Sequence, residues 1–243
     1  MLRSVKELKN YQIDATDGLI GHVKDVFFDD EARAIRYFVV DTGTWLSSRK
    51  VLISPIGLNH TDWKEKTLSV ATTKEQVKNS PHIHTDKPVS RQHEIQHLGH
   101  YGHQRYWGST GLWGSNAVPF IVSGGSTSVG RQPDSESGNE DIFSDIDAVV
   151  HRDDDPHLRS CNVVMGYHVE ATDGEIGHIE DMLVDEESWA IRFLIINTSN
   201  WWLGHKVLIE AQSIQGISWN AKLVSLNLTR QEVKNAPIPE GNS

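Results

Sequence analysis

Short apolar runs separated by polar turns recur near both ends of this chain of 243 residues. Residues 11–15 alternate between polar and apolar side chains as a strand does, and residues 35–40 form a β-branched and aromatic run typical of a strand buried on both faces. Between them, residues 16–18 and 29–33 predict polar turns. Five or six short strands at this spacing predict a small barrel or sandwich.

The same pattern occurs twice. Residues 15–22 read ATDGLIGH, and residues 171–178 read ATDGEIGH. The offset of 156 residues holds without a gap from residues 2–81 to residues 158–237, and roughly 30 of the aligned pairs are identical. The duplication predicts two domains, residues 1–81 and 158–238, with a linker at residues 82–157.

A short helix is expected to close each repeat. Thr73 is followed three residues later by Gln76, and Thr229 is followed by Glu232, which is the spacing of a capping box. Pro81 then ends the first of these helices.

The linker differs in composition from the repeats. Residues 88–90 could cap a short helix that begins at Arg91. Residues 106–114 are rich in aromatic residues and glycine, and would hold one position only if they lay on a barrel. Residues 124–140 contain few large apolar side chains to offset the entropy of ordering, so we expect this stretch to be mobile and to be cut first by proteases.

Composition excludes several classes of protein. The net charge is −10 and the pI about 5.7, without the dense positive charge of a nucleic-acid binder. Cys161 is the single cysteine, which rules out an internal disulfide and a multi-cysteine metal site. The start does not resemble a signal peptide, and no run of about 18 apolar residues occurs, so we expect a cytoplasmic protein without membrane insertion.

Residues 93–97 carry the pattern His-Glu-x-x-His, in which two histidines one helical turn apart bind zinc and the glutamate acts as a base. His103 lies where zinc proteases of the metzincin type place a third ligand, but His100 stands where their pattern has glycine. Because the motif lies in the linker, outside both repeats, we favour a polar helix with a solvated Glu94. Metal binding by His93, His97 and His103 stays open as an alternative, and so does zinc catalysis.

Four aspartates recur at equivalent positions: Asp25 and Asp181, and Asp29 and Asp185. Within each repeat the two carboxylates stand four residues apart, which is about 13 Å along a strand and too far for a shared proton. We interpret them as turn and barrel-end hydrogen-bonding groups, and we predict no catalytic residues.

The two copies are expected to pack on each other as an intramolecular pseudo-dimer, because closed two-fold pairing is the commonest way for like surfaces to bury each other. Cys161 replaces Val5 of the first copy, which indicates a buried apolar position. Four recurring tryptophans indicate core or copy–copy packing: Trp45 and Trp201, and Trp63 and Trp219.

Two stretches in each copy carry a resemblance to a known family. Residues 17–26 read DGLIGHVKDV and are followed by IRYFVV at residues 35–40; the second copy has DGEIGHIEDM and IRFLII. Both copies resemble the PRC-barrel family, which is named for the cytoplasmic domain of the photosynthetic reaction-centre H subunit and includes a domain of a ribosome-maturation factor. The resemblance implies a small β-barrel used for protein contacts, without shared catalytic residues.

The expected fold is therefore mainly β, with two small PRC-type β-barrels, each closed by a short helix and joined by a long irregular linker. We expect a non-enzymatic protein-binding or scaffold module that uses no cofactor, whose partner the sequence does not name. One alternative is an accessory of a membrane photosynthetic or electron-transfer complex that docks peripherally. The other is a zinc hydrolase that uses His93, Glu94 and His97.

Overall fold

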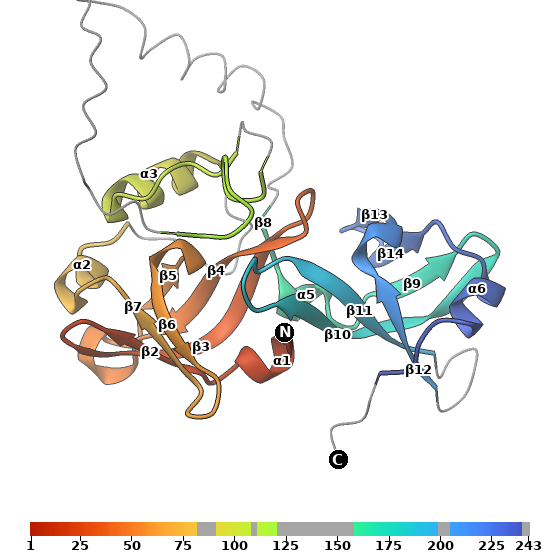
Figure 1. Cartoon of the computed structure of the whole chain (residues 1–243), viewed down its shortest axis with the longest axis horizontal. Helices are drawn as coiled ribbons and strands as arrows, with labels where there is room; N and C mark the ends of the chain where they lie inside the picture. The colour runs from red at the N-terminus through yellow and green to blue at the C-terminus, as the bar shows by residue number, and fades with distance from the viewer. Residues whose placement is uncertain (82–90, 108–110, 121–157, 199–204, 240–243) are drawn as a thin grey trace, which may run out of the picture.

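A computed structural model describes residues 1–81, 91–107, 111–120, 158–198 and 205–239. The fold is mainly β, as predicted, and contains two seven-stranded sheets, one for each repeat (Figure 1). The predicted domain limits stay a prediction, and residues 124–140, which we expect to be mobile, lie outside the described residues.

The first sheet has the strand order β5-β4-β3-β2-β7-β6, with β8 (Leu158–Ser160) paired to β3. Its closing helix begins with the predicted capping box, in which Thr73 and Gln76 each bind the other's backbone N–H. The elements up to the linker are β1 (Leu2–Ser4), α1 (Val5–Leu8), β2 (Gln12–Ala15), β3 (Gly18–Asp29), β4 (Ala34–Asp41), η1 (Gly43–Leu46), β5 (Lys50–Ile53), η2 (Pro55–Gly57), β6 (Leu58–Asp62), β7 (Thr67–Val70) and α2 (Lys74–Lys78).

The second sheet has the equivalent order β12-β11-β10-β9-β14-β13, with β1 paired to β10. Thr229 and Glu232 form its capping box. The remaining elements are the linker helix α3 (Arg91–Tyr101), then β8 (Leu158–Ser160), α5 (Cys161–Val164), β9 (His168–Ala171), β10 (Gly174–Asp185), β11 (Ile191–Asn197), β12 (Lys206–Glu210), η3 (Ala211–Ser213), β13 (Ile214–Ser218), β14 (Leu223–Leu226) and α6 (Arg230–Lys234).

The first strand of each repeat belongs to the sheet of the other repeat. Strand β1 pairs antiparallel with β10, with Ser4 opposite Leu183, and β8 pairs antiparallel with β3, with Ser160 opposite Phe27. Figure 1 accordingly shows the N-terminus at the junction of the two units. The Leu-Arg-Ser sequence that opens each repeat is thus an exchanged strand, and the expected pairing of the copies is present.

Two aspartates hold the exchanged strands in place. Asp25 accepts hydrogen bonds from the Ser160 hydroxyl and from the Asn162 backbone N–H, the latter at 3.2 Å. Asp181 accepts the equivalent bonds from Ser4 and from the Lys6 N–H, again at 3.2 Å. Both aspartates therefore serve as hydrogen-bonding groups, as expected, but they bind the strand-to-helix corner of the other repeat and not a turn of their own repeat.

The second aspartate pair does bind turns, as expected. Asp29 accepts from the backbone N–H groups of Glu31 and Ala32, and Asp185 accepts from those of Glu187 and Ser188.

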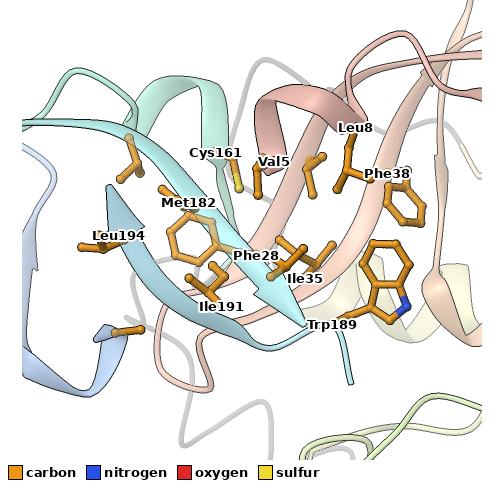
Figure 2. Packing of buried hydrophobic residues seen from close by; sticks show 14 of the residues in the cluster. Val5, Leu8, Phe28, Ile35, Phe38, Cys161, Met182, Trp189, Ile191 and Leu194 are labelled. Carbon is orange, nitrogen blue, oxygen red and sulfur yellow. The ribbon is translucent and has the colours of Figure 1, made fainter. Parts of the chain in front are cut away.

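One hydrophobic core continues through both repeats. At its centre the Cys161 side chain lies beside Val5, between the short helices α5 and α1 (Figure 2). Both side chains are fully buried, and this burial raises the pKa of the Cys161 thiol well above its ordinary value. The prediction of a buried apolar position at Cys161 is confirmed.

Recurring tryptophans contribute to this packing. Trp63 meets Tyr11 of its own repeat edge-on, and it also lies 6.2 Å from the ring of Trp189 in the other repeat. In the second repeat, Trp219 makes the equivalent edge-on contact with Tyr167. Trp201 lies outside the described residues.

Replacing Asp181 by alanine should lower the free energy of unfolding by about 2–4 kcal/mol. The change leaves the Ser4 hydroxyl and two backbone N–H groups without their acceptor at a partly buried junction. Urea denaturation measures the loss, and Glu170→Ala, which removes an exposed carboxylate from β9, is the control. Equal stability of the two variants would contradict the role given to Asp181.

Candidate functional site

The linker helix α3 covers the outer face of the first sheet (Figure 1). The His97 ring meets the Tyr37 ring of β4 edge-on, with centroids 5.2 Å apart. The helix begins at Arg91 as predicted. Under it lies a small apolar cluster whose members are at most 2% exposed: Phe27, Tyr37, Val39, Leu52 and Leu158.

Glu94 lies inside this assembly. Its side chain is 0% exposed and accepts a hydrogen bond from the Tyr106 hydroxyl. The expectation of a solvated Glu94 is therefore wrong. The reason is that the chain after α3 turns back, so that Tyr106 reaches a carboxylate on the first turns of the helix.

A buried arginine ties the linker to the first repeat. Arg36 on β4 is 2% exposed and lies 3.5 Å from the Asp29 carboxylate. Its guanidinium lies over the rings of Tyr106 and Trp113, at 3.8 and 4.6 Å from their centroids, and donates to the Leu112 carbonyl at 2.7 Å. Stacking and hydrogen bonds of this kind offset the cost of burying a cation.

The same aromatic segment reaches the second repeat. The Trp113 indole N–H donates a hydrogen bond of 2.8 Å to the Ser188 carbonyl, in the turn between β10 and β11. The sequence indicated that residues 106–114 need a barrel surface to lie on, and the described part of this segment contacts both repeats. It thus fixes the linker against the junction.

Two linker histidines are shifted strongly toward their neutral forms. Burial lowers the pKa of His97 to about 3, with further lowering from His103 and His100. Burial also lowers the pKa of His103 to about 4. Between them, burial raises the pKa of Tyr101 to about 12. A row of rings therefore runs along the end of α3 in uncharged form at neutral pH.

The three candidate metal ligands occupy different environments. His93 is exposed, whereas His97, one turn later, is 1% exposed and packs between the rings of Tyr37 and Tyr101. His103 lies near Gly57 of the first repeat. Within the described parts of the chain, no group of three His, Cys, Asp or Glu side chains is placed to hold a metal ion. Metal binding by these histidines stays a prediction.

A pocket of about 100 Å³ opens beside His103. Ligand sites usually measure about 300–1,000 Å³, so this space suits a few water molecules better than a substrate. The residues that line it come from the first repeat and from the end of α3: Ile53, Ser54, Gly57, Val70, Ala71, Thr72, Gln76, Tyr101, Gly102 and His103.

Sequence reasoning missed Arg36, the residue on which the linker contacts converge. The available signal was a single cation between Ile35 and Tyr37, inside a run predicted to be buried on both faces. A charge in such a run needs a buried partner, and the aromatic linker segment was the natural source of one.

Comparison with known proteins agrees with this fold. Residues 3–77 match the family model of the PRC-barrel domain, so the first repeat is a PRC-barrel domain. A protein of Deinococcus radiodurans described as "Uncharacterized protein" is 38% identical over 71 residues, which cover 29% of this chain and 25% of that protein. The match thus spans about a quarter of the relative's length. The second repeat is linked to the first by the internal duplication and the shared strand order.

Replacing His97 by leucine should make the free energy of unfolding less dependent on pH under acidic conditions. In the native protein His97 stays neutral down to about pH 3, whereas in the unfolded chain it binds a proton near pH 6.5, so acidification favours unfolding. Between about pH 6 and about pH 4, the free energy of unfolding of the variant should fall by about 1.4 kcal/mol less per pH unit than that of the wild type.

Urea unfolding at several pH values measures this slope. His93→Leu is the matched control, because it lies one turn away on the same helix and is exposed. Identical slopes for wild type and His97→Leu would mean that His97 is not buried in neutral form.

Proposed function

We propose that the protein is a non-enzymatic protein-binding or scaffold module. The observation that carries this proposal is the use of its candidate catalytic groups in structural contacts. Asp25 and Asp181 bind the exchanged strand corners, and Glu94 binds Tyr106 within the linker. The PRC-barrel match of the first repeat supports the same conclusion, since the family resemblance implies protein contacts without shared catalytic residues.

A role as accessory of a membrane photosynthetic or electron-transfer complex is a second candidate. It rests on the resemblance to the reaction-centre H subunit. Within the described residues, no helix has the length and apolar character needed to cross a membrane. Such a role would therefore use peripheral docking, from the cytoplasmic side that we propose for this protein.

A zinc hydrolase built on His93, Glu94 and His97 is disfavoured by the surroundings of the motif. A zincin glutamate polarises a metal-bound water, which requires access to the metal and to solvent. Glu94 is fully buried and accepts the Tyr106 hydroxyl instead, and the His97 ring lies among aromatic side chains.

Replacing Glu94 by glutamine distinguishes a structural role of Glu94 from a role as the catalytic glutamate of a zinc hydrolase. For a structural glutamate, the purified wild type incubated with zinc should not cleave a fluorogenic peptide. The variant should be about 1–3 kcal/mol less stable, because the buried hydrogen bond with the Tyr106 hydroxyl is altered. This cost exceeds the roughly 0.5 kcal/mol expected for a solvated residue. Tyr106→Phe, which removes the donor, is the matched variant and should cost a similar amount.

Zinc-dependent cleavage by the wild type, lost by orders of magnitude in Glu94→Gln at unchanged fold, would overturn the non-enzymatic proposal. Affinity purification from the source cells tests its positive side. We expect one protein partner in near-stoichiometric amount, and recovery in the membrane fraction would favour the accessory role.

A further inference from the structure

The second repeat carries the same outer face that α3 covers in the first repeat. Adding the repeat offset of 156 residues to Phe27, Tyr37, Val39 and Leu52 gives four apolar residues of the second repeat, and subtracting it from Leu158 gives a fifth. We call this set the second-repeat face. Its members are Leu2, Leu183, Phe193, Ile195 and Leu208.

These residues form one patch because of the strand register. Leu183 on β10 lies opposite Phe193 on β11, and Ile195 on β11 lies opposite Leu208 on β12. Strand β1 adds Leu2 at the other side of β10. The patch therefore runs across four neighbouring strands, as its counterpart does in the first sheet.

The two faces differ in how far their side chains are exposed to solvent. The first-repeat cluster is at most 2% exposed, whereas Leu2 is 44% exposed and the other four members of the second-repeat face are half-buried. The same holds for the cation beside each face: Arg36 is 2% exposed, and its equivalent Arg192 is exposed. A contiguous apolar surface that stays partly exposed to solvent is a candidate interaction site.

The first repeat shows what this type of face accepts. Helix α3 has 11 residues and places His97 and Leu98, each 1% exposed, against the first repeat, while Tyr106 and Trp113 stack on Arg36. Apart from α3, the helices within the described residues have three to five residues each, too short to cover four strands in the same way.

We propose that the second-repeat face is the docking surface for an amphipathic helix of a partner protein. The helix would present aliphatic and aromatic side chains at spacings of three and four residues, and an aromatic ring of the partner would stack on Arg192. The net charge of −10 disfavours both a second copy of this chain and an anionic membrane as the occupant. The proposal rests on the proposed function as a protein-binding module.

Site-specific photo-crosslinking tests the surface in the source cells. The full chain carries p-benzoylphenylalanine at Phe193, or as a control at Val163, which is 56% exposed on α5. After irradiation, mass spectrometry maps the attached peptide. We expect one partner protein at position 193, joined through a segment with apolar residues at helical spacing, and no enrichment of that protein at position 163.

Binding of the purified partner then measures the contribution of the face. Phe193→Asp should weaken the affinity at least about tenfold, whereas Val163→Asp should change it less than about twofold. Circular dichroism and urea unfolding verify that both variants fold, and Leu208→Ser replaces Phe193→Asp if the latter does not.

Three outcomes would contradict the proposed docking surface without contradicting the proposed function. They are crosslinks from position 193 to residues 121–157 of the same chain, crosslinks to a second copy, and unchanged affinity of the folded Phe193→Asp variant for a partner that the wild type binds. Absence of any protein partner, at position 193 and in affinity purification, overturns both the surface and the proposed function.

Discussion

The reciprocal exchange of the first strands is the constraint on which the rest of the structure depends. Each exchanged serine donates to an aspartate of the other repeat and at the same time accepts from its own short helix, so one hydroxyl closes the corner and joins the repeats. The Asp25 carboxylate is half-buried at this junction, and its burial raises the pKa of Asp25. With the backbone ladders and the shared core, these contacts make neither sheet complete without the other repeat.

The linker breaks the symmetry that the exchange creates. Two equivalent sheet faces exist, but the described linker has one helix of sufficient length, and it lies on the first face. Once α3 is there, the first repeat can bury polar groups that the second repeat leaves outside. Arg36 is enclosed by two aromatic rings, whereas Arg192, at the same strand position, is exposed. Identical sequence motifs thus acquire different physical properties from what covers them.

The sequence predicted those features that depend on local pattern. The strands, the two capping boxes and the helix beginning at Arg91 each depend on residues that are close together in the sequence. The exchange was not predictable, because Leu-Arg-Ser has the same local pattern whether it pairs with its own repeat or with the other. The burial of Glu94 was missed for a similar reason: its donor, Tyr106, lies 12 residues away and beyond the helix. The strand exchange and the burial of Glu94 both depend on contacts between segments distant in the sequence, and helical periodicity does not predict such contacts.

The same distinction governs how the His-Glu-x-x-His pattern should be interpreted. The spacing places its side chains on one side of a helix, but catalysis also needs an open metal position and an ionised carboxylate that reaches water. In α3 the glutamate is held by a phenol and the second histidine is neutral among aromatic rings, so the polar residues of the motif stabilise the cover on the first sheet. Helix α3 covers the outer face of the first repeat, and the second-repeat face, which we propose as the docking surface, is its one equivalent. Under the proposed function, a single such face orients a partner in one direction relative to the two repeats, which two equally exposed faces would not do.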